Sequence, residues 1–196
     1  MHRDDEASKF GMWLFIFTEI LLFGGLFVVY SVYRSIHPEA FRLAGEELDW
    51  VIGSVNTVIL IVSSATIAMS ITAIQKGNKK LTLQLLYTTV ILALIFLVNK
   101  YCEWGTKFDH GFYPSSEVLG ELGFGTILFF GLYFFMTGLH AFHIIVGVVF
   151  IGFIINFVHK GKIDKGNHQL LENSGLYWHL VDLIWIFLFP LFYLIH

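Results

Sequence analysis

The sequence predicts an all-α integral membrane protein, a bundle of five transmembrane helices. Two observations carry this prediction. Hydrophobic residues make up 56% of the 196 residues and charged residues only 14%, whereas soluble domains average about 45–50% apolar and about 25% charged residues. Five runs are almost free of charge, and each is close to the length of about 20 residues that a membrane-crossing helix needs. The composition therefore excludes an ordinary water-soluble globular protein.

The predicted spans follow from where charges interrupt the apolar runs. Glu19 is the single charge in the first run, the second and third runs are uncharged, and Asp182 is the single charge in the fifth. The fourth run, Leu122–Val158, is too short for two spans and a turn, so we predict one long helix there. Residues 1–196 are thus expected to form one transmembrane domain, with spans at 10–33, 51–74, 81–101, 125–158 and 177–195.

The distribution of Lys and Arg predicts the orientation, because these residues are enriched in cytoplasmic connections. Most of them fall on the side of the N-terminus, among them Lys9, Lys76, Lys79, Lys80, Lys160, Lys162 and Lys165. The other side holds Arg34, Arg42, Lys100 and Lys107, together with acidic residues such as Glu103, which we assign to the outer connections. The N-terminus is therefore expected inside and the C-terminus outside.

Glu19 is expected near the middle of the first span. An ionised carboxylate there costs about 2.5–3.5 kcal/mol, so we expect this side chain to be protonated or hydrogen-bonded inside the bundle. Two interpretations stay open. The carboxyl group serves in proton handling or in a lipid or subunit contact, or it is a neutral group that ties helices together.

His140 and His143 lie three residues apart in the fourth span, so both are expected on roughly one helix face. A metal or haem site would need further ligands at the same depth on other helices, and these are missing from the sequence. We favour neutral imidazoles that make hydrogen bonds between helices, with Glu19 as a candidate partner. A self-contained cytochrome or metalloenzyme is the alternative that this pair of histidines leaves open.

His179 and Asp182 also lie three apart, and we expect them to form a structural pair, with a proton-transfer role as the alternative. The sequence contains no hydroxyl nucleophile with a paired base, no phosphate-binding glycine loop and no zinc-spaced cluster. We therefore expect no catalytic residue, cofactor-binding residue or metal ligand. A net charge of -3 without a basic block argues against a nucleic-acid partner.

Motifs distributed along the chain resemble subunit III of the haem-copper terminal oxidases, in its short five-helix bacterial form. They are Gly11–Glu19, Asn56-Thr57 followed by Ser63-Ser64, Tyr101–Trp104, Thr137–His143 with Gly147, and Glu172 followed by Tyr177–Asp182 and Trp185. The blocks run in the same order as in that family. The two N-terminal helices of the longer, seven-helix members have no counterpart here.

This resemblance implies an accessory subunit of a proton-pumping oxidase in aerobic respiration, with cytochrome c oxidase as the first choice. Haem and copper would lie on partner subunits. The chain would pack against subunit I and, beyond it, subunits II and IV or a larger respiratory supercomplex, bind phospholipid, and support proton uptake and stability in the bacterial inner (plasma) membrane. By the same resemblance, the structural or proton-linked residues would be Glu19, His140, His143, Glu172, His179 and Asp182.

Several alternatives remain at this stage. Within the same superfamily, the chain could be subunit III of a quinol oxidase or the related accessory subunit of a nitric oxide reductase. Outside it, Glu19 leaves open an independent proton channel or transporter. The absence of an apparent internal repeat argues against the inverted-repeat transporter plan.

Overall fold

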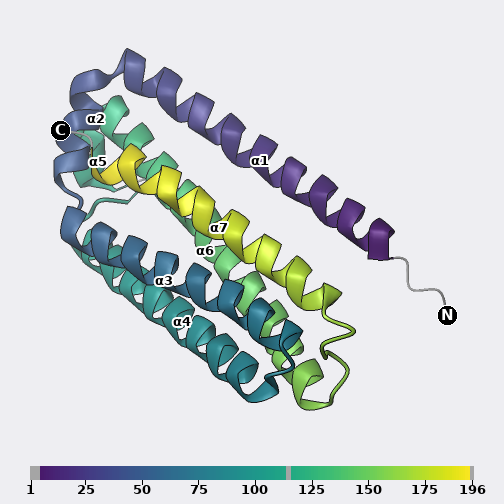
Figure 1. Ribbon diagram of the computed structural model, residues 1–196. Helices are drawn as coiled ribbons and strands as arrows, with labels where there is room; N and C mark the ends of the chain where they lie inside the picture. The colour runs from purple at the N-terminus through teal and green to yellow at the C-terminus, as the bar shows by residue number, and fades with distance from the viewer. Residues whose placement is uncertain (1–4, 114–115, 195–196) are drawn as a thin grey trace.

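The computed structural model describes residues 5–113 and 116–194 (Figure 1). Residue 195, the end of the fifth predicted span, lies outside these ranges. The helices, in chain order, are α1 Asp5–Ile36, α2 Pro38–Glu46, α3 Trp50–Gln75, α4 Lys79–Asp109, α5 Glu117–Leu122, α6 Phe124–His159 and α7 Gln169–Tyr193. Across the described ranges, extended pairing is limited to one isolated bridge between Asp164 and Asn167. The predicted all-α class is confirmed.

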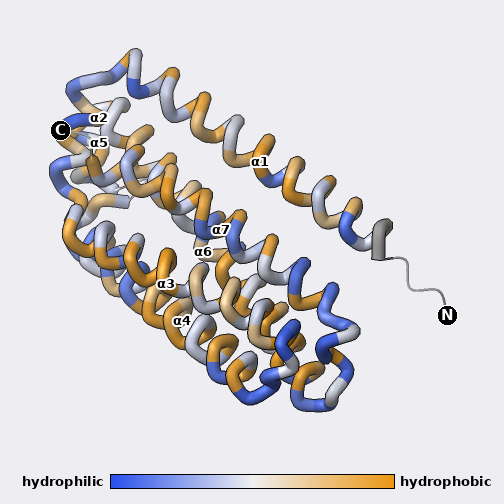
Figure 2. The backbone as a smooth tube through the Cα atoms, in the orientation of Figure 1, coloured by the Kyte–Doolittle hydropathy of each residue, from blue (hydrophilic) through white to orange (hydrophobic). Residues whose placement is uncertain are grey.

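Five of these helices, α1, α3, α4, α6 and α7, are long and apolar enough to cross a membrane. Apolar residues dominate their lengths, and polar residues gather at the two ends of the bundle (Figure 2). The fourth apolar run folds as one helix, α6, whose 36 residues begin directly after Gly123. The prediction of a multi-pass bundle of five long helices is therefore confirmed.

The helix α7 lies at the centre of the bundle. It packs against α3 on one side and α6 on another, and α4 completes a four-helix core by packing on α3 and α6 (Figure 1). The most apolar stretch of α7 is 56% buried, whereas that of α1 is only 11% buried. The α1 helix is thus an edge helix that runs along α6 and α7, and most of its surface is free for lipid or another chain.

Contacts near both ends hold α1 to the core. At one end, the Tyr30 hydroxyl donates a hydrogen bond to the Leu191 carbonyl of α7. At the other, the Asn173 side chain of α7 donates to the Ser8 hydroxyl over 2.9 Å. The short helix α2 returns from α1 over α6, where Phe41 packs edge-on against Tyr30 and Phe129. These contacts fix where the middle of α1 lies relative to α6.

Local sequence signals set the turn between α3 and α4. Gly77 has a φ of 79°, a left-handed conformation that glycine adopts without steric cost. The side chain of Asn78 then caps α4 by accepting a hydrogen bond from the Leu81 amide over 3.1 Å. The resulting tight turn places α3 and α4 antiparallel and in contact along their length.

A glycine allows α6 and α7 to approach closely. A Cβ atom at Gly147 of α6 would lie 2.8 Å from ring carbons of Trp178 and 3.1 Å from the ring of Tyr177. Trp178 is fully buried and its indole nitrogen is hydrogen-bonded to Ser63 over 3.0 Å, so the ring cannot easily move aside. Gly152, also on α6, faces open space instead.

Gly147→Val is expected to lower the free energy of unfolding by about 1–3 kcal/mol or more, because the added carbons overlap a fixed indole ring. Gly152→Val is the matched control, since no atom lies near a Cβ at that position. Thermal unfolding of the purified chain in mild detergent measures both. Equal losses of stability in the two variants would contradict the proposed close contact.

Candidate functional site

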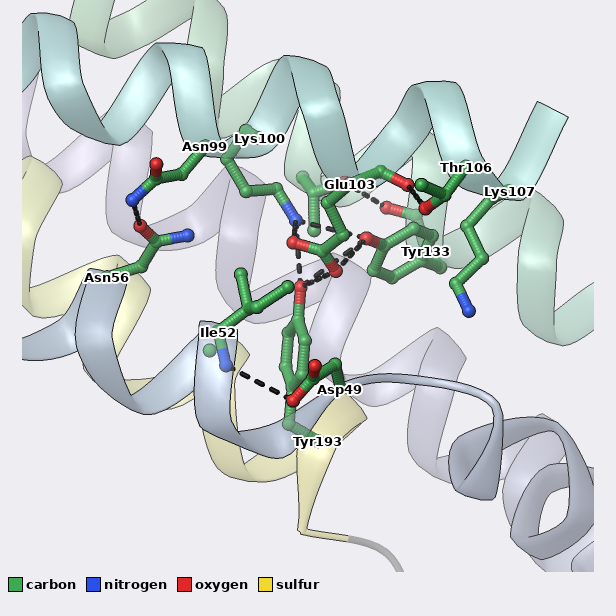
Figure 3. A network of polar contacts seen from close by, with 12 residues as sticks. Asp49, Ile52, Asn56, Asn99, Lys100, Glu103, Thr106, Lys107, Tyr133 and Tyr193 are labelled. Carbon is green, nitrogen blue, oxygen red and sulfur yellow. Dashed lines mark hydrogen bonds and ion pairs between the residues drawn. The ribbon is translucent and has the colours of Figure 1, made fainter. Parts of the chain in front are cut away.

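A buried cluster of four polar side chains joins α4, α6 and α7 near the end of the bundle that carries α2 (Figure 3). It consists of Lys100 and Glu103 of α4, Tyr133 of α6 and Tyr193 of α7, and we call it the Lys100 cluster. The ammonium group donates to Glu103 over 3.0 Å, to the Tyr133 hydroxyl over 3.0 Å and to the Tyr193 hydroxyl over 2.8 Å. All four residues are at most 4% exposed.

The hydrogen bonds of the Lys100 cluster form a closed set. An ammonium group has three N–H donors, and each finds one acceptor here. Both tyrosine hydroxyls donate hydrogen bonds to Oε1 of Glu103, over 2.7 Å from Tyr133 and 2.5 Å from Tyr193. Removing two charges from water is costly, and the cost is offset only when the remaining donors and acceptors are satisfied as they are here.

The cluster corrects the end of the third predicted span, 81–101, and the assignment of Glu103 to an outer connection beyond it. The α4 helix continues to Asp109, so both side chains lie inside it, one turn apart, and face the other helices. A charged residue usually marks the end of a membrane span. Here the opposite charges of Lys100 and Glu103 form an ion pair inside the bundle, so the span continues past them. The three-residue spacing of Lys100 and Glu103 was the available signal, whereas the two distant tyrosines could not be assigned to them from spacing.

Glu19 and His143 meet between α1 and α6. The Nε2 atom of His143 lies 3.0 Å from Oε2 of Glu19, within ion-pair distance but without the alignment of a hydrogen bond. On the other side of the ring, Nδ1 lies 2.7 Å from the Leu139 carbonyl oxygen. A carbonyl oxygen can only accept, so that contact places a proton on Nδ1 and leaves Nε2 as the ring atom that faces the carboxyl group of Glu19.

An open cavity of about 650 Å³ adjoins this pair, between α1 and the α6–α7 side of the core. We call it the α1 cleft. Apolar side chains make up most of its wall, including Phe15, Phe150, Phe153 and Phe157. Polar side chains of the wall are Glu19, His143, Asn173 and Ser174. A mostly apolar cleft with a few polar groups suits an acyl chain better than a polar metabolite.

His140 does not share a site with His143, contrary to the expectation from their spacing. Its ring is fully buried in the four-helix core, 5.2 Å from the ring of Trp185 and 5.7 Å from that of Phe96, measured between centroids. Neither ring nitrogen makes a hydrogen bond to any residue in the described part of the chain. The small angular offset between the two positions is enough to turn one ring to α4 and α7 and the other to α1.

The expected pair of His179 with Asp182 is not formed. His179 instead makes a 2.6 Å hydrogen bond through Nδ1 to the Ser64 hydroxyl of α3. Neighbouring α3 hydroxyls accept from the indole nitrogens of α7, Ser63 from Trp178 and Thr57 from Trp185, each over 3.0 Å. These three side chains of α7 therefore bond across to α3, because the close packing of the two antiparallel helices offers nearer partners than the next turn does.

Glu172 lies at the opposite end of the bundle from the Lys100 cluster, in the first turn of α7. Its carboxylate is 3.2 Å from Nε2 of His168 and 4.0 Å from the Lys9 ammonium group of α1. It thus helps to join the start of α1 to the start of α7. Among the described residues, no group of three or more His, Cys, Asp or Glu side chains is placed to hold a metal ion.

The fold and these interior polar contacts define a polytopic helical membrane protein in which buried polar side chains join different helices. The sequence profile for cytochrome c oxidase subunit III matches residues 4–196, nearly the whole chain. This chain belongs to the cytochrome c oxidase subunit III family of haem-copper oxidases.

Relatives within this family carry several names. Cytochrome c oxidase subunit 3 of Thermostichus vulcanus is 30% identical over 99% of this chain and 90% of its own. The haem-copper oxidase subunit I+III of Aeropyrum pernix is 29% identical over 97% of this chain, which spans 23% of that longer protein. A probable quinol oxidase subunit 3 of Staphylococcus aureus is 28% identical over 98% of this chain and 91% of its own.

Tyr193→Phe is expected to lower the free energy of unfolding by about 1–3 kcal/mol, because Glu103 loses a donor and Lys100 loses an acceptor in a buried site. Tyr101→Phe is the matched control, since that ring is 79% exposed. Unfolding in mixed detergent micelles measures both. If the free energy of unfolding of Tyr193→Phe equals that of Tyr101→Phe, the stability of the cluster does not depend on the Tyr193 hydroxyl.

Proposed function

We propose that this chain is the accessory subunit III of a proton-pumping haem-copper terminal oxidase, with cytochrome c oxidase as the preferred type, and that it carries no redox centre itself. The observation that supports the proposal best is the family match over residues 4–196. The haem and copper centres belong to partner subunits. The chain packs against subunit I, an arrangement supported by the relative in which parts I and III form one polypeptide.

The proposed role of the chain is to stabilise subunit I and to sustain its proton uptake, partly through bound phospholipid. The α1 cleft supports lipid binding because it is open, apolar and about 650 Å³ in volume. We assign Glu19 and His143 a structural or proton-linked role at its wall, since Nε2 and Oε2 lie 3.0 Å apart there. The same kind of role is proposed for His140, Glu172, His179 and Asp182.

We place the chain in the bacterial inner membrane with its N-terminus inside. The end of the bundle that holds the N-terminus also carries the basic connections. Lys9 approaches Glu172 there, and Lys79 donates a hydrogen bond to the His159 carbonyl over 2.9 Å. The arrangement agrees with the enrichment of Lys and Arg in cytoplasmic connections.

A quinol oxidase is the second candidate, and one observation favours it. The relative named as a probable quinol oxidase subunit 3 covers this chain as fully as the cytochrome c oxidase relatives do, at nearly the same identity. The electron donor is bound elsewhere in such complexes, so this subunit's own residues do not decide between the two types.

Purification of the complex from cells with and without this chain tests the proposal. We expect subunit I to copurify with the tagged chain in mild detergent, and we expect the haem and copper content per subunit I to stay the same when the chain is deleted. Turnover, or its persistence over many cycles, should fall. Loss of metal together with the chain, unaffected turnover, or copurification with a nitric oxide reductase instead would contradict the proposal.

A further inference from the structure

A second cavity opens on the outside of the bundle between α3 and α7, with a volume of about 420 Å³. We call it the α3–α7 notch. Its wall includes Ser64, Ala65 and Ala68 of α3 and His179, Asp182 and Ile186 of α7. The α3 residues are small, so a neighbouring helix could approach the backbone closely at this point. Both helices reach the notch near the middle of their length.

Asp182 is the unsatisfied group in this notch. The side chain is 4% exposed, and neither carboxylate oxygen makes a hydrogen bond of normal geometry within the described chain. The Ser64 hydroxyl, which also contacts His179 over 2.6 Å, is the one neighbour near enough to donate to this carboxyl group. One donor of poor geometry leaves the second oxygen of an ionised carboxylate without a partner and leaves a protonated one without an acceptor, so in either state the notch is incomplete.

This incompleteness is costly in a membrane, because hydrocarbon offers no hydrogen bonds and an unsatisfied polar group costs several kcal/mol. Acyl chains could fill the space but could not bond to Asp182. A second copy of this chain would bring a second buried carboxyl group, which would compete for the few donors of Ser64 and His179 in the wall. The site is complementary to a protein side chain with N–H or O–H donors, carried on a helix at the same depth.

We infer that the α3–α7 notch receives a donor-bearing side chain from a transmembrane helix of subunit I, with Asp182 as its acceptor. This inference rests on the proposed function, which supplies subunit I as the neighbouring chain. It goes further by assigning the docking face. The α3–α7 face, rather than the outer face of α4, lies against subunit I, and the small α3 residues set the distance of approach.

Photo-crosslinking in the intact complex tests which face is covered. A benzoylphenylalanine at Ile186, which is 44% exposed beside the notch, is compared with one at Ile91 of α4, which is 56% exposed. We expect an adduct with epitope-tagged subunit I from Ile186 and about tenfold less from Ile91. Four results would show that the docking face is wrong while the proposed function stands, provided that subunit I copurifies. They are equal crosslinking from both positions, crosslinking from Ile91 alone, crosslinking from neither position, and an adduct from Ile186 that joins two copies of this chain. If subunit I does not copurify at all, the proposed function fails with it.

Filling the notch gives an independent measurement. Ala68→Phe should reduce the amount of this chain that stays with subunit I in mild detergent by about tenfold, the factor that the loss of one hydrogen bond produces. Thr88→Phe places the same ring on the exposed face of α4 and should change nothing. Both side chains point outward, so the amount of folded chain in the membrane should match wild type and serves as the control.

Substitutions of Asp182 show whether subunit I is bound through the carboxyl group or only through the shape of the notch. Asp182→Asn keeps an acceptor oxygen and should retain most of the binding, whereas Asp182→Leu removes the acceptor and should lose as much as Ala68→Phe. Equal retention of the Leu variant and wild type would overturn the inference, because the carboxyl group would then have no partner in subunit I.

Discussion

The structure depends on one constraint: a membrane interior supplies no hydrogen bonds, so each polar side chain inside the bundle must find its partner in protein. The Lys100 cluster meets this constraint with a closed set of bonds among four buried residues. The α3 hydroxyls meet it by accepting from Trp178 and Trp185. Each solution joins different helices, so the polar groups also set which helices are neighbours. Apolar packing alone would be much less selective, since lipid is as apolar as the helix surfaces.

Much of the fold could be predicted from charge placement alone. Five apolar runs became five long helices, and the uncharged stretch around Gly131 became the single helix α6, because length in hydrocarbon leaves few alternatives. The meeting of Glu19 with His143 was among the expected contacts, since a mid-membrane acid has few possible partners. What composition could not supply was the role of the chain, which came from the ordered motifs and the family they indicate.

The remaining features depended on three-dimensional neighbours that helical spacing does not reveal. The third span was predicted to end just after Lys100, with Glu103 in a connection, because their partners Tyr133 and Tyr193 lie far away in sequence. His179 bonds to α3 rather than to Asp182 for a similar reason. The exceptions to the constraint are therefore informative. Asp182 lacks a hydrogen bond of normal geometry among the described residues and borders an open notch. Under the proposed function, a helix of subunit I supplies the missing bond.

A double-mutant cycle on the Lys100 cluster tests the central claim most directly. Lys100→Met and Glu103→Leu, made separately, should each lower the free energy of unfolding by about 3–5 kcal/mol, because each leaves a buried group without its partner. The double variant should lose clearly less than the sum of the two single losses, because neither charge is then left alone, although the hydroxyls of Tyr133 and Tyr193 lose their partners. The exposed pair of Arg42 with Glu46 on α2 is the control, with an expected coupling below about 1 kcal/mol. If the two losses at Lys100 and Glu103 simply add, the partners do not depend on each other and the account is contradicted.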